Sequence, residues 1–260
     1  MKFYLVLAFL GLPVSYAIAQ KLPSETENAT ARIFPTYAKV YSAPAQDAAV
    51  TDSIAANRAV QISTNEEQTA ADWISVSYQS GKQKKKGYVR ADALASALAV
   101  SGNFQVLFGK YYVKKPETAN SRAAVKVYEN RILVAETDFE FAAEAFSSSK
   151  ISLGNHRNLK NVLLTIKVTG TAHHNQTVAY EKNMLVTKSK ELIMLPLLKT
   201  VEQPYFSHRE TLHFPQSPGS GSSILKIKKE SSDQNTDNGS EESSVSETIY
   251  VWDGSGLRIN

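Results

Sequence analysis

Histidine is the residue type to test first for chemistry, because it binds metals and transfers protons near neutral pH. A zinc-peptidase helix carries two histidines four residues apart with a glutamate after the first, and no pair in this chain has that pattern. His208 and His213 lie with Glu210 between Pro204 and Pro215, where a loop ligand set is an alternative. Surface histidine is the commoner state, so we expect no metal site. The chain has five histidines, His156, His173, His174, His208 and His213.

Nucleophiles and cofactor motifs are the next candidates. The chain has no cysteine, which excludes thiol peptidases and transpeptidases. It also lacks the Gly-x-Ser-x-Gly elbow, the phosphate loop and the dinucleotide fingerprint. Carboxylate pairs such as Glu140 with Glu144 occur in any soluble chain, and sequence alone does not place two of them in one cleft, as a glycosidase requires. We therefore expect no catalytic residue and no cofactor.

The N-terminus has the organisation of a secretory signal peptide. Lys2 precedes the apolar run Phe3–Val14, and Ala17-Ile18-Ala19 then matches a cleavage site. A glycine and a proline interrupt this run, whereas an uncleaved span needs about 20 continuous apolar residues. We expect cleavage after residue 19, a periplasmic or extracellular mature chain without an integral membrane span, and a flexible leader at residues 20–31. The missing cysteines favour a bacterial envelope over a disulfide-bonded eukaryotic protein.

Charge limits the partners. The formal net charge of +4 is too small to indicate nucleic acid. Residues 231–247 contain five acidic residues and no Lys or Arg among Ser, Asn, Gln and Gly. Such a segment has little to bury, which predicts a disordered acidic loop. A calcium loop is the alternative, but the regular Asp-x-Asp-x-Asp-Gly spacing is missing.

Alternation of apolar and polar residues indicates β-structure in the N-terminal third. From Trp73 to Tyr78 apolar residues alternate with Ser75 and Ser77, which predicts a strand with one buried face. The basic run Lys82–Lys86 follows and leads into a second strand. Short strands with turn signals every eight to twelve residues indicate a small barrel or sandwich at residues 32–98.

Four segments follow one another in this region: Val40-Tyr41-Ser42-Ala43-Pro44, Asn57-Arg58-Ala59-Val60, Asp72-Trp73-Ile74-Ser75-Val76 and Gly87-Tyr88-Val89. Their order resembles the bacterial SH3-like (SH3b) domain. Asn57 stands where that family usually has a turn glycine, and asparagine accepts the left-handed backbone that such a turn needs. The resemblance covers residues 32–98 and implies a small barrel that binds peptidoglycan or peptide, or acts as a spacer, in envelope proteins.

Two aromatic and three basic residues are the candidate ligand contacts. Tyr41 and Tyr78 are expected at the surface, where a ring with a polar tip can bind an extended chain. Lys84, Lys85 and Lys86 are expected in solvent at a hairpin tip, where they would attract an anionic polymer or acidic partner; solubility is the alternative explanation. Trp73 is expected in the barrel core, because its strand alternates with β-branched residues.

The apolar runs of residues 104–260 predict a second, mostly antiparallel β domain. The boundary to it is expected near residues 95–103. The run at 161–168 predicts a central strand, and segment 138–146 fits either a strand or an amphipathic helix. Residues 224–227 are expected to pair with 248–251, and the Asp-Gly turn at 253–254 predicts a final hairpin. We recognise no family for this part.

The sequence therefore predicts a secreted or periplasmic binding or structural protein with a mainly β fold, an SH3-like barrel followed by a second β domain. Its expected partner is a cell-wall polymer, a peptide or an envelope protein. The alternative is a cysteine-free envelope hydrolase that acts through the C-terminal domain.

Overall fold

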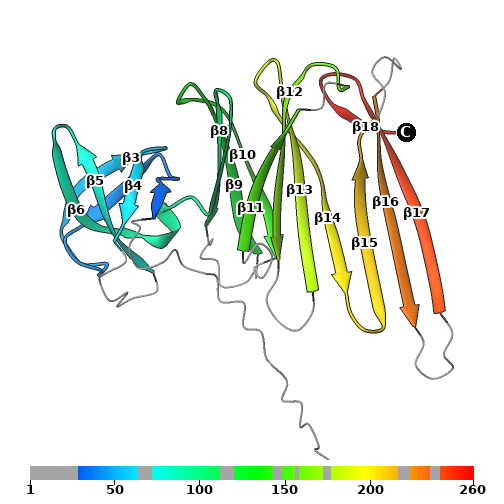
Figure 1. Cartoon of the computed structure of the whole chain (residues 1–260), viewed down its shortest axis with the longest axis horizontal. Coiled ribbons are helices and arrows are strands. Elements are labelled where there is room, and N and C mark those ends of the chain that lie inside the picture. The colour runs from blue at the N-terminus through cyan, green and yellow to red at the C-terminus, as the bar shows by residue number, and fades with distance from the viewer. Residues whose placement is uncertain are drawn as a thin grey trace, which may run out of the picture.

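Extended backbone forms nearly all of the structure, a computed structural model that describes residues 29–63, 72–111, 120–142, 148–155, 158–171, 177–215, 223–234 and 241–260. Within these ranges the chain forms strands β1 to β18 and one short 3-10 helix, η1 (Ala91–Ala93), without an α-helix. All paired strands are antiparallel and lie in sheets of six, four and eight strands (Figure 1). The predicted mainly β fold is confirmed. The predicted signal peptide lies outside the described residues.

The six-stranded sheet buries one face of its strands. Along β2, Ala38 and Val40 are buried while their neighbours are exposed or half-buried, as alternation requires. Gly87 has no side chain, and a Cβ there would overlap Val40, so this glycine lets β2 cross close over β6. In sheet order the strands are β1 (Thr30–Arg32), β4 (Ala59–Ile62), β5 (Trp73–Ser80), β6 (Gln83–Arg90), β2 (Tyr37–Tyr41) and β3 (Val50–Ala55).

Ile33 connects distant segments of this sheet through two backbone contacts. Asn57 has φ of 59°, the left-handed conformation expected for it, and its N–H donates to the Ile33 carbonyl at 2.8 Å. Ile33 also forms a β-bridge with Leu94. Thr30 and Ala31, assigned to the flexible leader by sequence, instead form most of β1, because β4 offers them a free edge to pair with.

The four-stranded sheet covers one half of the eight-stranded sheet. Val125 and Val127 on its central strand, and Phe108 beside them, point inward and pack on Ile166 and Met184 of the larger sheet. The residues of this cluster lie at every second position of their strands, so a single register buries a whole face. In order the strands are β10 (Ile132–Ala142), β9 (Asn120–Glu129), β8 (Phe104–Tyr111) and β7 (Ala97–Ser101).

The extent of these strands decides two sequence-based assignments. Residues 97 and 98, placed in the N-terminal barrel by sequence, belong to β7 in the four-stranded sheet, because β7 pairs with β8. Residues 138–142 are the end of strand β10 rather than a helix, and 143–147 lie outside the described residues.

The eight-stranded sheet is a meander in which each strand pairs with the next. Its β12 corresponds to the predicted central strand, and it is flanked on both sides. The predicted pairing of 224–227 with 248–251 and the final Asp-Gly hairpin are also present. The strands are β11 (Ser148–Gly154), β12 (Val162–Thr171), β13 (Thr177–Thr187), β14 (Leu192–Glu202), β15 (Phe206–His213), β16 (Ser223–Gln234), β17 (Glu241–Trp252) and β18 (Leu257–Ile259).

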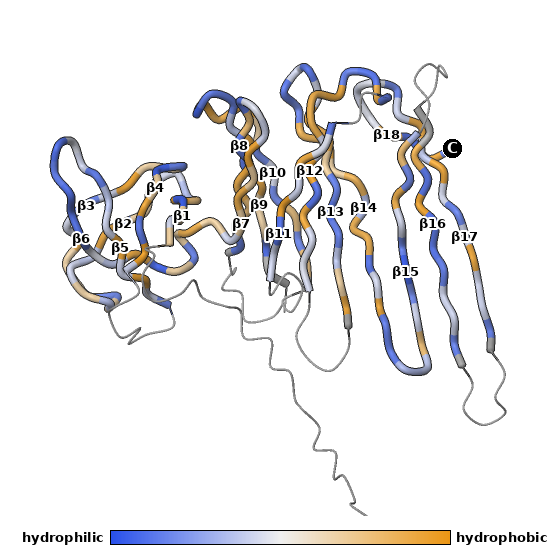
Figure 2. The backbone as a smooth tube through the Cα atoms, in the orientation of Figure 1, coloured by the Kyte–Doolittle hydropathy of each residue, from blue (hydrophilic) through white to orange (hydrophobic). Residues whose placement is uncertain are grey.

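The acidic segment differs from its prediction. Residues 231–234 and 241–247 lie in β16 and β17 and pair in register, and 235–240 lie outside the described residues. The ladder needs no burial of its own at this end, because its base is apolar: Leu225 lies in a hydrophobic cluster with Trp252, and Ile227 is also buried. Cross-strand contacts extend it outward, including a 2.8 Å hydrogen bond between the Ser231 and Ser244 hydroxyls. Figure 2 shows this change from an apolar base to a more polar end along β16 and β17.

Candidate functional site

The hairpin of β5 and β6 distributes the sequence-predicted ligand residues over two faces. Its register places Tyr78 opposite Lys85, so both point to the side of the core. Lys84 and Lys86 alternate with Lys85 and therefore point to the other face. Tyr41 pairs with Tyr88 on that second face. Tyr41, Lys84 and Lys86 thus share a side of the sheet, whereas Tyr78 and Lys85 do not join them.

Tyr78 has a structural role in this arrangement. Its side chain is only 6% exposed, so the expectation of a surface tyrosine was wrong. The hydroxyl donates to Asp52 at 3.0 Å, and the Lys85 ammonium donates to the same oxygen at 2.8 Å. Hydrogen bonds from Lys85, the Ser53 N–H and Tyr78 lower the pKa of Asp52 to about 2. Burial and the Asp52 carboxylate raise the pKa of Tyr78 to about 12. The network joins β3 to the hairpin and leaves neither side chain free for a ligand.

Trp73 is buried, as predicted, but it lies outside the hydrophobic cluster that fills this sheet. Its ring meets Tyr41 edge to face, with 4.9 Å between centroids, and the Arg90 guanidinium lies 5.9 Å from its centroid. The tryptophan therefore packs on the face that also carries Tyr41, and not on the core face.

The six-stranded and four-stranded sheets meet around one phenylalanine. Phe34 is 5% exposed and packs with Leu107, Ala124 and Tyr128 on the outer face of the four-stranded sheet. Gly109 provides the space for its ring, because an added Cβ would overlap that ring. The connecting segment is bonded to both sheets, because the Ala95 N–H donates to the Arg32 carbonyl at 2.8 Å and the Ser96 N–H donates to the Phe108 carbonyl at 2.8 Å. The two sheets are therefore held in a fixed arrangement.

A groove of about 630 Å³ opens beside Phe34 at this junction. Lys126 lies at its floor with a side chain only 7% exposed, 3.4 Å from the Glu136 carboxylate and 5.1 Å from the Phe34 ring centroid. Arg122 binds Asp138 beside it. The groove combines an apolar floor with a rim that carries more carboxylates than cations. Its lining residues are Phe34, Pro35, Thr36, Asp92, Ala93, Ala124, Lys126, Glu136, Thr137 and Asp138.

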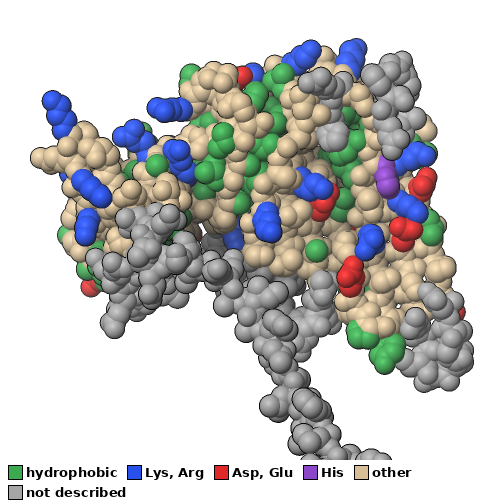
Figure 3. Space-filling model, in the orientation of Figure 1, with side chains coloured by type: hydrophobic (Ala, Val, Ile, Leu, Met, Phe, Trp, Pro, Cys, Tyr) green, Lys and Arg blue, Asp and Glu red, His purple; other side chains and the backbone are tan. Residues whose placement is uncertain are grey.

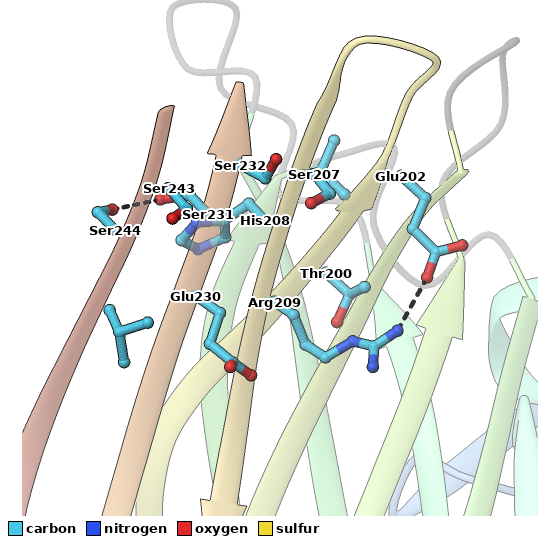
Figure 4. Close-up of a pocket in the computed structure, with 12 residues that line it drawn as sticks. Thr200, Glu202, Ser207, His208, Arg209, Glu230, Ser231, Ser232, Ser243 and Ser244 are labelled. Atoms are coloured by element: carbon cyan, nitrogen blue, oxygen red, sulfur yellow. Dashed lines mark hydrogen bonds and ion pairs between the residues drawn. The ribbon is translucent and has the colours of Figure 1, made fainter. Parts of the chain in front are cut away.

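A smaller hollow of about 290 Å³ lies over β14 to β17 (Figure 4). Its lining is rich in hydroxyls, and Arg209 and Glu202 form an ion pair of 3.2 Å at one side. His208 lies on this part of the sheet, but His213 is five residues further along the same strand and so faces the other way. No cluster of three potential metal ligands occurs in the described ranges, and the other three histidines lie outside them. The sequence-based loop of histidine ligands is therefore a strand.

Glu210 fills the point where β14 and β15 separate. These strands pair only over Thr200–Glu202, and beyond that the Glu210 carboxylate accepts the Lys199 N–H at 2.9 Å. Lys229 lies 2.8 Å from the same carboxylate, which is 11% exposed. Burial alone would raise the pKa of Glu210, but the hydrogen bonds from Lys229, Lys199 and His208 and the charge of Lys229 outweigh it and lower that pKa. The carboxylate therefore takes the place of the missing strand partner.

Sequence reasoning missed the junction groove, although it carries a signal. Lys126 alternates with buried valines, which marks β9 as a strand with two different faces. The sequence does not reveal that Phe34, about ninety residues earlier, covers the face of β9 on which Lys126 lies.

Comparison with known protein families, curated proteins and solved structures finds no significant match. No helix in the described part of the chain has the length and apolar character that crossing a membrane requires.

Proposed function

We propose that this chain is a secreted or periplasmic binding protein that recognises a cell-envelope component, peptidoglycan or a peptide segment of an envelope protein. In this proposal residues 30–94 form an SH3-like module and the strands from β7 onward form a second β domain. The ligand lies in the groove between them, and the protein carries out no reaction. The groove beside Phe34 is the observation that supports this function best.

Three properties of the groove fit an extended peptide. It is larger than the hollow over β14 to β17, and it lies at the junction of two sheets, where ligand sites often occur. Its floor of Phe34, Ala93 and Ala124 offers apolar contact. The rim carboxylates of Asp92 and Glu136 suit amino and amide N–H groups, and the shielded Lys126 suits a carboxylate. Peptidoglycan stem peptides carry all of these groups.

Filling the groove tests the proposal. Thr36 lines the groove and is exposed, whereas the adjacent Tyr37 is exposed but does not line it. We expect Thr36→Trp to weaken retention on purified sacculi, or binding of muropeptides in calorimetry, by about tenfold or more, which corresponds to about 1.4 kcal/mol. The matched variant Tyr37→Trp should bind as the unmodified chain does.

The same assay distinguishes the groove beside Phe34 from the outer face of the β5–β6 hairpin. If Lys84→Ser with Lys86→Ser abolishes retention while Thr36→Trp leaves it intact, the ligand binds the outer face of the hairpin and the groove assignment is wrong. If the mature chain is not retained on sacculi and no envelope peptide binds, the binding function itself is refuted.

The hydrolase alternative has less support. His208 contacts a carboxylate, with its Nε2 atom 3.5 Å from the Glu210 Oε1 atom. That carboxylate is already held by Lys229 and the Lys199 N–H, so it stabilises the sheet. Turnover of wall fragments by the purified chain, abolished by His208→Ala, would reverse this preference.

A further inference from the structure

Strand β17 of the eight-stranded sheet has an edge that its neighbour β18 covers only in part. β18 covers β17 only over Tyr250–Trp252, and the Asn260 N–H then donates to the Ile249 carbonyl at 3.0 Å. Between Glu242 and Thr248, no residue in the described ranges pairs with this side of β17. Seven residues of regular strand are therefore available for pairing.

The backbone groups at this edge can be assigned. Because the Ile249 carbonyl points outward, and alternate residues of an antiparallel strand direct N–H and C=O to the same side, Ser243, Val245 and Glu247 direct theirs to the open edge. The pairing of β16 with β17 has no bulge, and the open segment contains no Pro or Lys. Proteins usually protect edges with such features. The open segment carries one exposed apolar residue, Val245, and two acidic residues, Glu242 and Glu247.

A second regular edge lies in the N-terminal sheet and has the opposite charge. β2 pairs with β6 only at Tyr41 and Tyr88, so the outer side of Gln83–Lys86 has no partner among the described residues. Lys84 and Lys86 are exposed on this segment. Over residues 29–63 and 72–94 the sheet carries eight Lys and Arg against four Asp and Glu, whereas β16 to β18 with their turn carry four against six.

The other outer strands are less suited to pairing. β1 and β18 have three residues each, and register shifts interrupt the pairing of β3 and of β10. β7 and β11 lie against each other. The two regular open edges lie at opposite ends of the long axis (Figure 1), and Figure 3 shows mostly basic side chains on the N-terminal sheet, whereas acidic and basic side chains are interspersed over the C-terminal strands.

From this arrangement we propose that copies of the chain assemble head to tail, with the acidic edge of β17 in one copy pairing with the basic edge of β6 in the next. The contact is a β-augmentation in which main-chain hydrogen bonds provide attraction and opposite charges select the partner edge. Because the two edges are different surfaces, the contact is heterologous and leads to open chains of copies unless the rotation closes a ring.

Charge-swapped variants test the assembly. Light scattering after size exclusion, over a concentration series of the mature chain, should show a mass that rises with concentration and falls at high salt. Lys84→Glu with Lys86→Glu, and separately Glu242→Lys with Glu247→Lys, should each give monomers. An equimolar mixture of the two variants should assemble again, because each then offers the edge that the other needs.

A backbone variant separates edge pairing from general attraction. The Val245 N–H is on the open side, so Val245→Pro removes a donor at the interface while the β16 ladder stays intact. It should abolish assembly without changing the circular dichroism spectrum, whereas Val245→Thr should assemble normally. A monomer at all concentrations, or two charge variants that stay monomeric when mixed, would overturn the proposal. A monomer that pairs only with added basic peptides would also overturn it in favour of a peptide partner.

Discussion

Adding one methyl group at Gly109 should weaken the attachment of the N-terminal sheet to the rest of the protein. A Cβ at this position would overlap the ring of Phe34, which is buried and packed on three sides. The ring cannot move aside freely, because the Lys126 ammonium and the Tyr128 side chain border it. Gly109→Ala must therefore displace Phe34 or the strand beneath it.

The magnitude follows from two opposing effects. Overpacking costs about 1–3 kcal/mol of the free energy of unfolding, and replacing glycine by alanine returns about 0.4–1 kcal/mol by restricting the unfolded chain. Phe34→Ala alone should cost about 3–5 kcal/mol. In that background the alanine at 109 has space, so its overpacking cost disappears. The coupling between the two positions should thus equal the overpacking cost, about 1–3 kcal/mol.

Urea denaturation of the four proteins in this double-mutant cycle measures the coupling. Gly256→Ala is the matched control, because no atom lies within 4 Å of a Cβ built there. It should change the free energy of unfolding by no more than about 0.5 kcal/mol. If Gly109→Ala destabilises the protein equally with and without the Phe34 ring, the contact that we assign to this junction does not exist.

Three further changes test individual contacts. Asp52→Asn should lower the free energy of unfolding at neutral pH. The pKa of Asp52 is lowered from 3.8 to about 2, so in urea titrations the difference in free energy of unfolding from the unmodified chain should shrink as pH falls through that window. In the same variant, ultraviolet titration should show the pKa of Tyr78 below 12 but still above 10.0, since burial is its main cause. Glu210→Gln should cost about 1–3 kcal/mol in urea denaturation, because Lys229 loses its counter-charge; an unchanged midpoint would contradict the bridging role. Trp252→Phe should cost about 1–3 kcal/mol in the same assay, because the Lys160 carbonyl loses its 2.8 Å hydrogen bond; a cost below that of a surface change would argue against it.

Local pattern was sufficient for much of the fold. Alternation identified the β5 strand, and an unbroken β-branched run identified β12, because side-chain periodicity reports directly on one or two buried faces. The acidic segment misled for a physical reason. Composition measures what a segment can bury, whereas β16 and β17 are held by a ladder that starts from an apolar base and continues through backbone bonds.

The candidate site was harder to predict, since it depends on contacts between distant residues. Tyr78 could be read as an exposed ring until Asp52, twenty-six residues away, is seen to accept its hydroxyl. Lys84, Lys85 and Lys86 read as one basic cluster, but strand geometry places the middle lysine on the opposite face. The groove beside Phe34 exists only because two sheets meet there, and no local pattern specifies that meeting.

The seam closed by Glu210 has a consequence for how the protein opens. The backbone ladder that joins β15 to β14 has only three residue pairs, and beyond it side chains make the connection: the Glu210 carboxylate, the Arg209–Glu202 ion pair, the Trp252 hydrogen bond to the Lys160 carbonyl and one apolar cluster. Native-state amide exchange should therefore divide this sheet into two cooperative units at β14, with the C-terminal unit exchanging through a lower-energy opening. The strand order of this sheet is continuous, but on the timescale of hydrogen exchange the sheet would then open as two separate units.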